Sequence, residues 1–152
     1  MGEAAKTFKQ LDKLWSRSSL GWKRKYNIYD SVVLSKLLYS LDSLWLLKAD
    51  RSRLDAFHHK SLRRILGIPS AYISRVSNAS VLQKASAIPL SQMLLSSQVK
   101  LYNNIANHDA HSLVKRVLFN ASGSLRDWSV RRKRGRPRQQ WAKSVHKFAQ
   151  HV

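Results

Sequence analysis

The sequence predicts an all-α fold, a helical bundle followed by a basic C-terminal arm and a short terminal helix. Apolar residues recur three or four positions apart through most of the chain, which is the spacing of one face of a helix. No segment of useful length alternates apolar and polar residues as a half-buried strand does. Serine, glycine and proline separate the apolar segments at positions where helices commonly begin and end.

The first 48 residues contain two predicted helices. Residues 4–16 form an amphipathic helix, and residues 18–21, Ser-Ser-Leu-Gly, end it. Residues 22–25, Trp-Lys-Arg-Lys, are expected to be a basic linker. The longest apolar segment, residues 26–48, should then be the central core helix, because its leucines and valines keep the helical period throughout.

A further long helix is expected over residues 50–66. Asp50 and Ser52 are its candidate N-caps. Gly67 suits a left-handed C-terminal conformation, and Pro69 prevents the helix from resuming.

The remaining helices are expected over residues 77–87, 89–105, 111–119 and 139–150. Ser77 offers a side-chain cap, and Pro89 is tolerated because it falls in the first turn of its helix. Trp141 lies near the start of the terminal helix and is expected to anchor it rather than to stack on bases.

Charge divides the chain into two predicted domains, a helical body over residues 1–124 and a basic arm over residues 125–152. The whole sequence has 28 Lys and Arg against 8 Asp and Glu, a formal net charge of +20. Residues 126–152 hold nine basic residues and one acidic residue, a net charge of +8. Such an excess of positive charge favours a nucleic-acid partner, an RNA–DNA or DNA duplex.

Several classes of protein are excluded by composition. The chain has no cysteine, so disulfides, thiol nucleophiles and cysteine-based zinc sites are absent. No apolar run is long enough for a signal core or a membrane span, which predicts a soluble, intracellular protein, with the nucleus as the expected compartment.

No constellation of catalytic residues is recognisable in the sequence. The carboxylates are scattered rather than paired as two-metal phosphoryl transfer requires. His108 with His111, and His58 with His59, are interpreted as ordinary surface histidines rather than metal ligands. We therefore expect no enzyme activity, no metal, no cofactor and no small-molecule substrate.

Two groups of cations are the candidate nucleic-acid-binding residues. The first lies in the arm and comprises Arg131, Arg132, Lys133, Arg134, Arg136 and Arg138, together with the uncharged Gly135 between them. The second lies near the end of the helix over residues 50–66 and comprises Lys60, Arg63 and Arg64. Cations at a helix C-terminus also favour the macrodipole, so Arg63 and Arg64 have a structural alternative.

The element Arg134-Gly135-Arg136-Pro137 resembles an AT-hook. Glycine lets the backbone approach the floor of a minor groove, proline keeps it extended, and the arginines reach into the electronegative channel of A·T-rich DNA. The alternative is a basic loop that contacts phosphates without base preference. An AT-hook-type DNA-binding or architectural protein is accordingly the second functional hypothesis.

Four stretches together resemble a known family. They are the stretch from Tyr26 to Trp45, which includes Lys36-Leu37-Leu38-Tyr39-Ser40-Leu41-Asp42-Ser43-Leu44-Trp45, the stretch from Leu54 to Ile68, Ser77-Asn78-Ala79-Ser80-Val81-Leu82, and Gly135-Arg136-Pro137-Arg138-Gln139-Gln140-Trp141. In this order and spacing they are similar to the region that follows the catalytic core of non-LTR (LINE-type) retrotransposon reverse transcriptases.

The resemblance implies a helical thumb with its downstream extension, which in such RNA-directed DNA polymerases grips the template–primer duplex. The Tyr-x-Asp-Asp motif of the catalytic palm and the Cys/His knuckle of many relatives do not occur in this sequence. The polymerase activity is therefore not transferred to this chain, which is expected to be a non-catalytic fragment of such an element.

Overall fold

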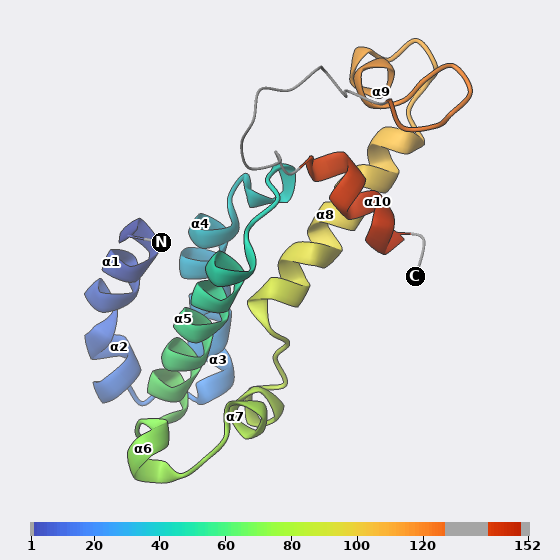
Figure 1. Cartoon of the computed structure of the whole chain (residues 1–152). Helices are drawn as coiled ribbons and strands as arrows, with labels where there is room; N and C mark the ends of the chain where they lie inside the picture. The colour runs from blue at the N-terminus through green and yellow to red at the C-terminus, as the bar shows by residue number, and fades with distance from the viewer. Residues whose placement is uncertain (1, 127–139, 150–152) are drawn as a thin grey trace. The chain divides into compact units, whose positions relative to one another are not determined.

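The structure is a computed structural model that describes residues 2–126 and 140–149 (Figure 1). Within these ranges the regular elements are helices, and the predicted all-α fold is confirmed. The elements are α1 (Gly2–Gln10), α2 (Asp12–Arg17), α3 (Trp22–Ile28), the π-helix η1 (Tyr29–Leu34), α4 (Ser35–Leu38), the 3₁₀ helix η2 (Leu41–Ser43), α5 (Lys48–Leu66), α6 (Ala71–Ser74), α7 (Asn78–Ala85), α8 (Leu90–Ala106), α9 (Leu113–Leu118) and α10 (Trp141–Ala149).

The contacts divide the chain into two compact units. Unit 1 comprises Met1–Tyr39 and Leu46–Leu94, and unit 2 comprises Ser40–Trp45 and Leu95–Val152. Helix α8 begins in unit 1 and continues into unit 2. The described residues of the predicted arm, 125–126 and 140–149, thus belong to the same unit as α9, while the boundary predicted from charge after residue 124 stays a prediction.

Unit 1 is a small bundle built around α5. Helices α2, α3 and α7 pack on α5, and α1 packs on η1 and α4. Tyr29, Val33 and Leu62 are fully buried in its core, as the apolar stripes predict. The stacked rings of Phe8 and Trp15, whose centroids are 5.2 Å apart, join α1 to α2.

The predicted central helix over residues 26–48 is wrong at both ends. Helix α3 already begins at Trp22, in the predicted linker, where the buried Lys25 ammonium donates a hydrogen bond of 3.0 Å to the Trp15 carbonyl oxygen. The helix ends at Leu38, because Ser40 adopts a left-handed φ of 59°. Beyond Leu38 the backbone is no longer α-helical, but Leu41 and Trp45 are still partly buried. This burial explains why the apolar pattern of the sequence continues past the end of the helix.

Several predicted helix boundaries are confirmed, although the single helix expected over residues 4–16 is divided into α1 and α2 at Leu11. Gly67 ends α5 with a φ of 68°, and the Ser77 hydroxyl oxygen accepts a hydrogen bond of 3.1 Å from the Ser80 amide at the start of α7. The Pro89 carbonyl oxygen accepts hydrogen bonds from the first turn of α8. The N-cap of α5 is wrong: it is Leu47, without a side-chain cap, rather than Asp50 or Ser52.

Unit 2 has its own core, formed by Tyr102, Ile105, Phe119 and Val145. The indole nitrogen of Trp141 donates a hydrogen bond of 2.7 Å to the Asp42 carbonyl oxygen. This contact bears out Trp141 as the anchor of the terminal helix. Among the described helices, none combines the length and the apolar character that crossing a bilayer requires.

Candidate nucleic-acid interface

The last two turns of α5 carry the predicted cations Lys60, Arg63 and Arg64, and the structure gives each a different environment. Lys60 is exposed, Arg64 is half-exposed and Arg63 is buried, with 7% of its surface accessible. The difference follows from helical geometry, since consecutive residues on a helix point about 100° apart. Only part of this cationic cluster is therefore presented to a ligand.

The Arg63 guanidinium points inward and braces the loop that follows α5. Its Nη1 donates hydrogen bonds to the Pro69 carbonyl oxygen at 3.2 Å and the Ser74 hydroxyl at 3.3 Å. Its Nη2 donates to the Val76 carbonyl oxygen at 2.6 Å and to Asn78 Oδ1 at 3.0 Å. A planar guanidinium carries five donors, enough to satisfy several loop acceptors at once. These donors are used internally, so Arg63 has a structural role in holding this loop, which differs from the macrodipole role expected from the sequence.

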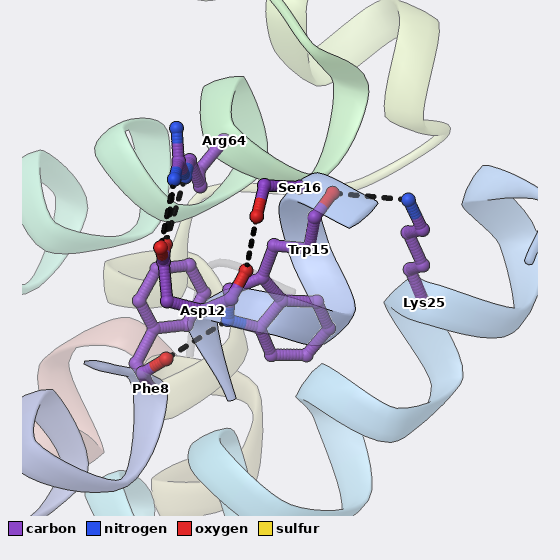
Figure 2. A network of polar contacts seen from close by, with 6 residues as sticks. All are labelled: Phe8, Asp12, Trp15, Ser16, Lys25 and Arg64. Carbon is purple, nitrogen blue, oxygen red and sulfur yellow. Dashed lines mark hydrogen bonds and ion pairs between the residues drawn. The ribbon is translucent and has the colours of Figure 1, made fainter. Parts of the chain in front are cut away.

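Arg64 pairs with a carboxylate from α2 (Figure 2). Its Nε and Nη2 donate to Asp12 Oδ1 at 2.9 and 2.8 Å, and Nη2 also reaches Oδ2 at 2.9 Å. The two side chains are 49% and 51% exposed, so solvent screens the pair and its contribution to stability is at most about 1 kcal/mol. Asp12 therefore competes with any phosphate for the Arg64 guanidinium.

The polar contacts around Asp12 hold α2 in place, as Figure 2 shows. The Ser16 hydroxyl donates a hydrogen bond of 2.8 Å to the Asp12 carbonyl oxygen. The indole of Trp15 donates one of 2.9 Å to the Phe8 carbonyl oxygen, which closes the turn between α1 and α2. The carboxylate facing Arg64 is thus carried by a helix that Trp15 ties to Phe8 of α1 and to Lys25 of α3.

A cavity of about 830 Å³ opens beside these residues in unit 1. Phe8 and Phe57 contribute apolar surface, and Lys9, Lys60 and Arg64 contribute positive charge. Its full lining is Ala5, Phe8, Lys9, Asp12, Ala56, Phe57, His59, Lys60, Ser61, Arg63, Arg64, Ile68, Pro69, Ser70, Ala71 and Asn78. We refer to it as the α5 groove. It joins aromatic surface to cations, the combination with which proteins hold nucleic-acid strands.

His58 is a core residue, so the prediction that it is an ordinary surface histidine is wrong. It is fully buried, its ring stacks on Tyr29, and its Nδ1 lies 3.0 Å from the Tyr29 hydroxyl. Burial, with a smaller effect from His59, lowers the pKa of His58 to about 4, although Asp55 and the Ile88 backbone oppose this shift. Burial also raises the pKa of the Tyr29 hydroxyl. The pair is a neutral hydrogen-bonded element of the core.

In residues 2–126 and 140–149, no three His, Cys, Asp or Glu side chains gather closely enough to hold a metal ion. Asp55 receives hydrogen bonds from the Ser91 amide at 2.9 Å and hydroxyl at 2.7 Å, which places it at the start of α8 as a helix-capping carboxylate.

The arm residues Arg131, Arg132, Lys133, Arg134, Gly135, Arg136 and Arg138 lie outside the described residues. The chain is anchored on either side of them. Arg126 donates from its amide to the Leu118 carbonyl oxygen at 2.9 Å and from Nε to the Phe119 carbonyl oxygen at 3.3 Å. Trp141 is held by Asp42, as described above. The basic run thus connects two fixed points of unit 2.

Two features of this region escaped the sequence analysis. The first is that the short helix α6 carries a highly exposed tyrosine, Tyr72. The second is that the Asp12 carboxylate accepts hydrogen bonds from the Arg64 guanidinium. One signal in the sequence does point to this face: no acidic residue occurs between Asp55 and Asp109, whereas six cations do. The pairing across 52 residues has no comparable local signal, because it depends on how α2 packs on α5.

Comparison of the chain with models of protein families, with curated proteins and with solved structures found no match. The resemblance to the reverse transcriptases of non-LTR retrotransposons therefore rests on the four stretches of sequence quoted above.

Proposed function

We propose that this chain corresponds to the thumb and downstream region of a non-LTR retrotransposon reverse transcriptase. In this role it has no catalytic residue and binds template–primer nucleic acid, an RNA–DNA or DNA duplex, through the phosphate backbone. Its place of action is intracellular, with the nucleus as the compartment where such an element meets chromosomal DNA.

The observation that carries the proposal is the distribution of charge. The net charge is +20, and the segment between Asp55 and Asp109, which includes most of α5, holds cations without acids. Lys60 and Lys9 extend this positive surface into the α5 groove. A ligand that neutralises such a surface is a polyanion, and a duplex supplies regularly spaced phosphates. The all-α architecture is compatible with a helical thumb.

The decisive experiment is the salt dependence of duplex binding. Fluorescence anisotropy with a labelled RNA–DNA hybrid and a labelled DNA duplex gives the affinity at several salt concentrations. If six to ten phosphates are contacted, the affinity falls by roughly a thousandfold or more between 50 and 200 mM salt. An affinity that hardly changes with salt would overturn the proposal.

Substitution of single cations then locates the interface. Replacing Lys60 with alanine should reduce the steepness of the salt dependence by about one counterion if its ammonium contacts a phosphate. Lys100, an exposed lysine of unit 2, serves as the matched control. An equal reduction for both variants would mean that binding depends on total charge rather than on the α5 groove.

The second candidate is an AT-hook-type architectural protein, favoured by the element Arg134-Gly135-Arg136-Pro137. It predicts preference for A·T-rich over G·C-rich duplex and loss of that preference in Arg136→Ala. The thumb proposal predicts little base preference, so a competition experiment with the two duplexes separates the candidates. Binding of neither duplex would exclude both.

A further inference from the structure

The short helix α6 presents two large apolar side chains to solvent. Tyr72 is 82% exposed and Ile73 is 71% exposed. Large side chains this accessible contribute nothing to a core, since burial is what makes them stabilising. Their neighbours Ser70 and Ala71 line the α5 groove, so this exposed surface adjoins it.

A cation is stacked on the exposed tyrosine. The guanidinium carbon of Arg75 lies 5.6 Å from the centroid of the Tyr72 ring. Even with this contact, 82% of Tyr72 stays accessible, so a flat ligand can still reach the ring. Tyr39, which is 83% exposed in the same unit, has no such cation in the described part of the chain.

Arg75 adopts a backbone conformation that arginine rarely takes. Its φ is 56°, and the other described non-glycine residues with positive φ, Ser40 and Ser86, are serines. A left-handed conformation is unfavourable for a side chain with a Cβ, and glycine would fit this helix end at no such penalty. Strained positions of this kind often accompany binding sites. Here the residue with the left-handed backbone is also the one whose guanidinium lies over the Tyr72 ring.

The loop that carries Tyr72 is held rigidly by Arg63. The four hydrogen bonds of that guanidinium reach residues on both sides of α6, from Pro69 to Asn78. An aromatic ring on a braced loop needs little ordering when a ligand binds, which favours affinity. The buried Arg63 thus holds the loop from the inside, and the exposed Tyr72 and Arg75 lie on the solvent side of the same loop.

We propose that Tyr72 and Arg75 form a stacking platform for an unpaired nucleobase of DNA or RNA at the end of a bound duplex. The inference rests on the proposed function and adds a second mode of contact to it. Every base has a flat π face, so an aromatic ring with a guanidinium beside it binds bases with little sequence preference. The acid-free segment around α6 draws the adjoining phosphate to Arg75, whereas an apolar partner gains nothing from this charge.

Three labelled probes test the platform with the full chain at one salt concentration. They are a blunt duplex, the same duplex with a single-stranded extension, and the same extension built from abasic nucleotides. The extension is made once of DNA and once of RNA, which identifies the strand that is preferred. The natural chain should bind the extended duplex roughly tenfold more tightly than the blunt and abasic probes.

The variants then assign this advantage to the platform. Tyr72→Ala should abolish it and leave binding to the blunt duplex unchanged, while Tyr72→Phe should retain it. Tyr39→Ala is the matched control and should behave like the natural chain. Arg75→Gly, which removes the cation and the backbone strain together, should weaken binding to the extended probes without lowering the melting temperature.

Equal binding of the blunt, extended and abasic probes by the natural chain would overturn the platform while leaving the proposed function intact. The same conclusion follows if Tyr72→Ala retains the advantage. Failure of the proposed function has a different signature, because then the blunt duplex itself is not bound at low salt.

Discussion

Arg64 and Asp12 form a bidentate ion pair across 52 residues of sequence, with contacts of 2.8 to 2.9 Å. The pair lies at the α5 groove, where both residues are among the lining side chains. It withholds a cation from any phosphate that enters the groove, although its own contribution to stability is small.

Releasing Arg64 should strengthen nucleic-acid binding. In Asp12→Asn the guanidinium loses its carboxylate and one negative charge leaves the groove, so duplex affinity should rise several-fold at low salt, an effect of about 1 kcal/mol. Asp30→Asn removes the same charge from an exposed position outside the groove and is the control. Anisotropy titrations of both variants measure the effect. A rise of equal size in the control would assign it to net charge alone.

Arg63 and Lys60, three residues apart on α5, should separate stability from binding. Arg63→Ala leaves the acceptors of the 69–78 loop without their donor, so the free energy of unfolding should fall by about 2–4 kcal/mol. Lys60→Ala should change it by no more than about 0.5 kcal/mol and weaken duplex binding instead. Urea unfolding and anisotropy give the two quantities. If Arg63→Ala is as stable as Lys60→Ala, the Arg63 guanidinium does not stabilise the 69–78 loop.

The buried His58 should make folding sensitive to mild acid. Its pKa is lowered from 6.5 to about 4 in the folded chain, so the neutral ring is favoured by folding. The resulting stability is fully present above pH 6.5 and is lost as the pH falls toward 4, a change on the order of 3 kcal/mol. His59, whose pKa burial also lowers, acts in the same direction.

Urea unfolding between pH 7 and pH 4 measures this dependence. His58→Gln cannot titrate, so its stability should be lower at pH 7 but should change less with pH. His111→Gln replaces an exposed histidine and should keep the slope of the natural chain. An unchanged slope in His58→Gln would assign the acid sensitivity to other groups.

Trp141 should stabilise unit 2 through its indole N–H. Trp141→Phe keeps the ring but removes the donor to the Asp42 carbonyl oxygen, which should lower the free energy of unfolding of this unit by about 1 kcal/mol. Hydrogen exchange of the amides in α10 reports this local loss. Trp22→Phe in unit 1, where the described part of the structure gives no indole hydrogen bond, is the control. Equal protection in both variants would contradict the anchoring role.

The sequence predicts well where local chemistry alone decides the conformation. Gly67 ends α5 in a left-handed turn and Ser77 caps α7 through its own side chain, and neither requires a distant partner. The prediction that the helix continues through Leu44 is wrong because a distant partner decides the conformation there. There the backbone leaves the α conformation at Ser40, and the amide of Gln98, far along the chain, donates to the carbonyl oxygens of Leu41 and Leu44.

The same distinction applies to the candidate site. Charge alone identified the cationic end of α5, but not which of its cations turns inward. Arg63 is buried because a loop later in the chain brings carbonyl and hydroxyl oxygens around it, and Arg64 is occupied because α2 packs nearby. Local sequence cannot encode such partners, since they are set by tertiary packing.

The fully buried Val145 of α10 has a consequence for the integrity of unit 2. It lies in a core with Tyr102 and Phe119, which come from the other side of the basic run, and the described contacts of this core are non-covalent. Cleavage between residues 126 and 140 should therefore leave the terminal helix bound. A peptide of residues 140–149, too short to be helical alone, should fold on a chain that ends at residue 126, so that two separate pieces reconstitute one folded unit.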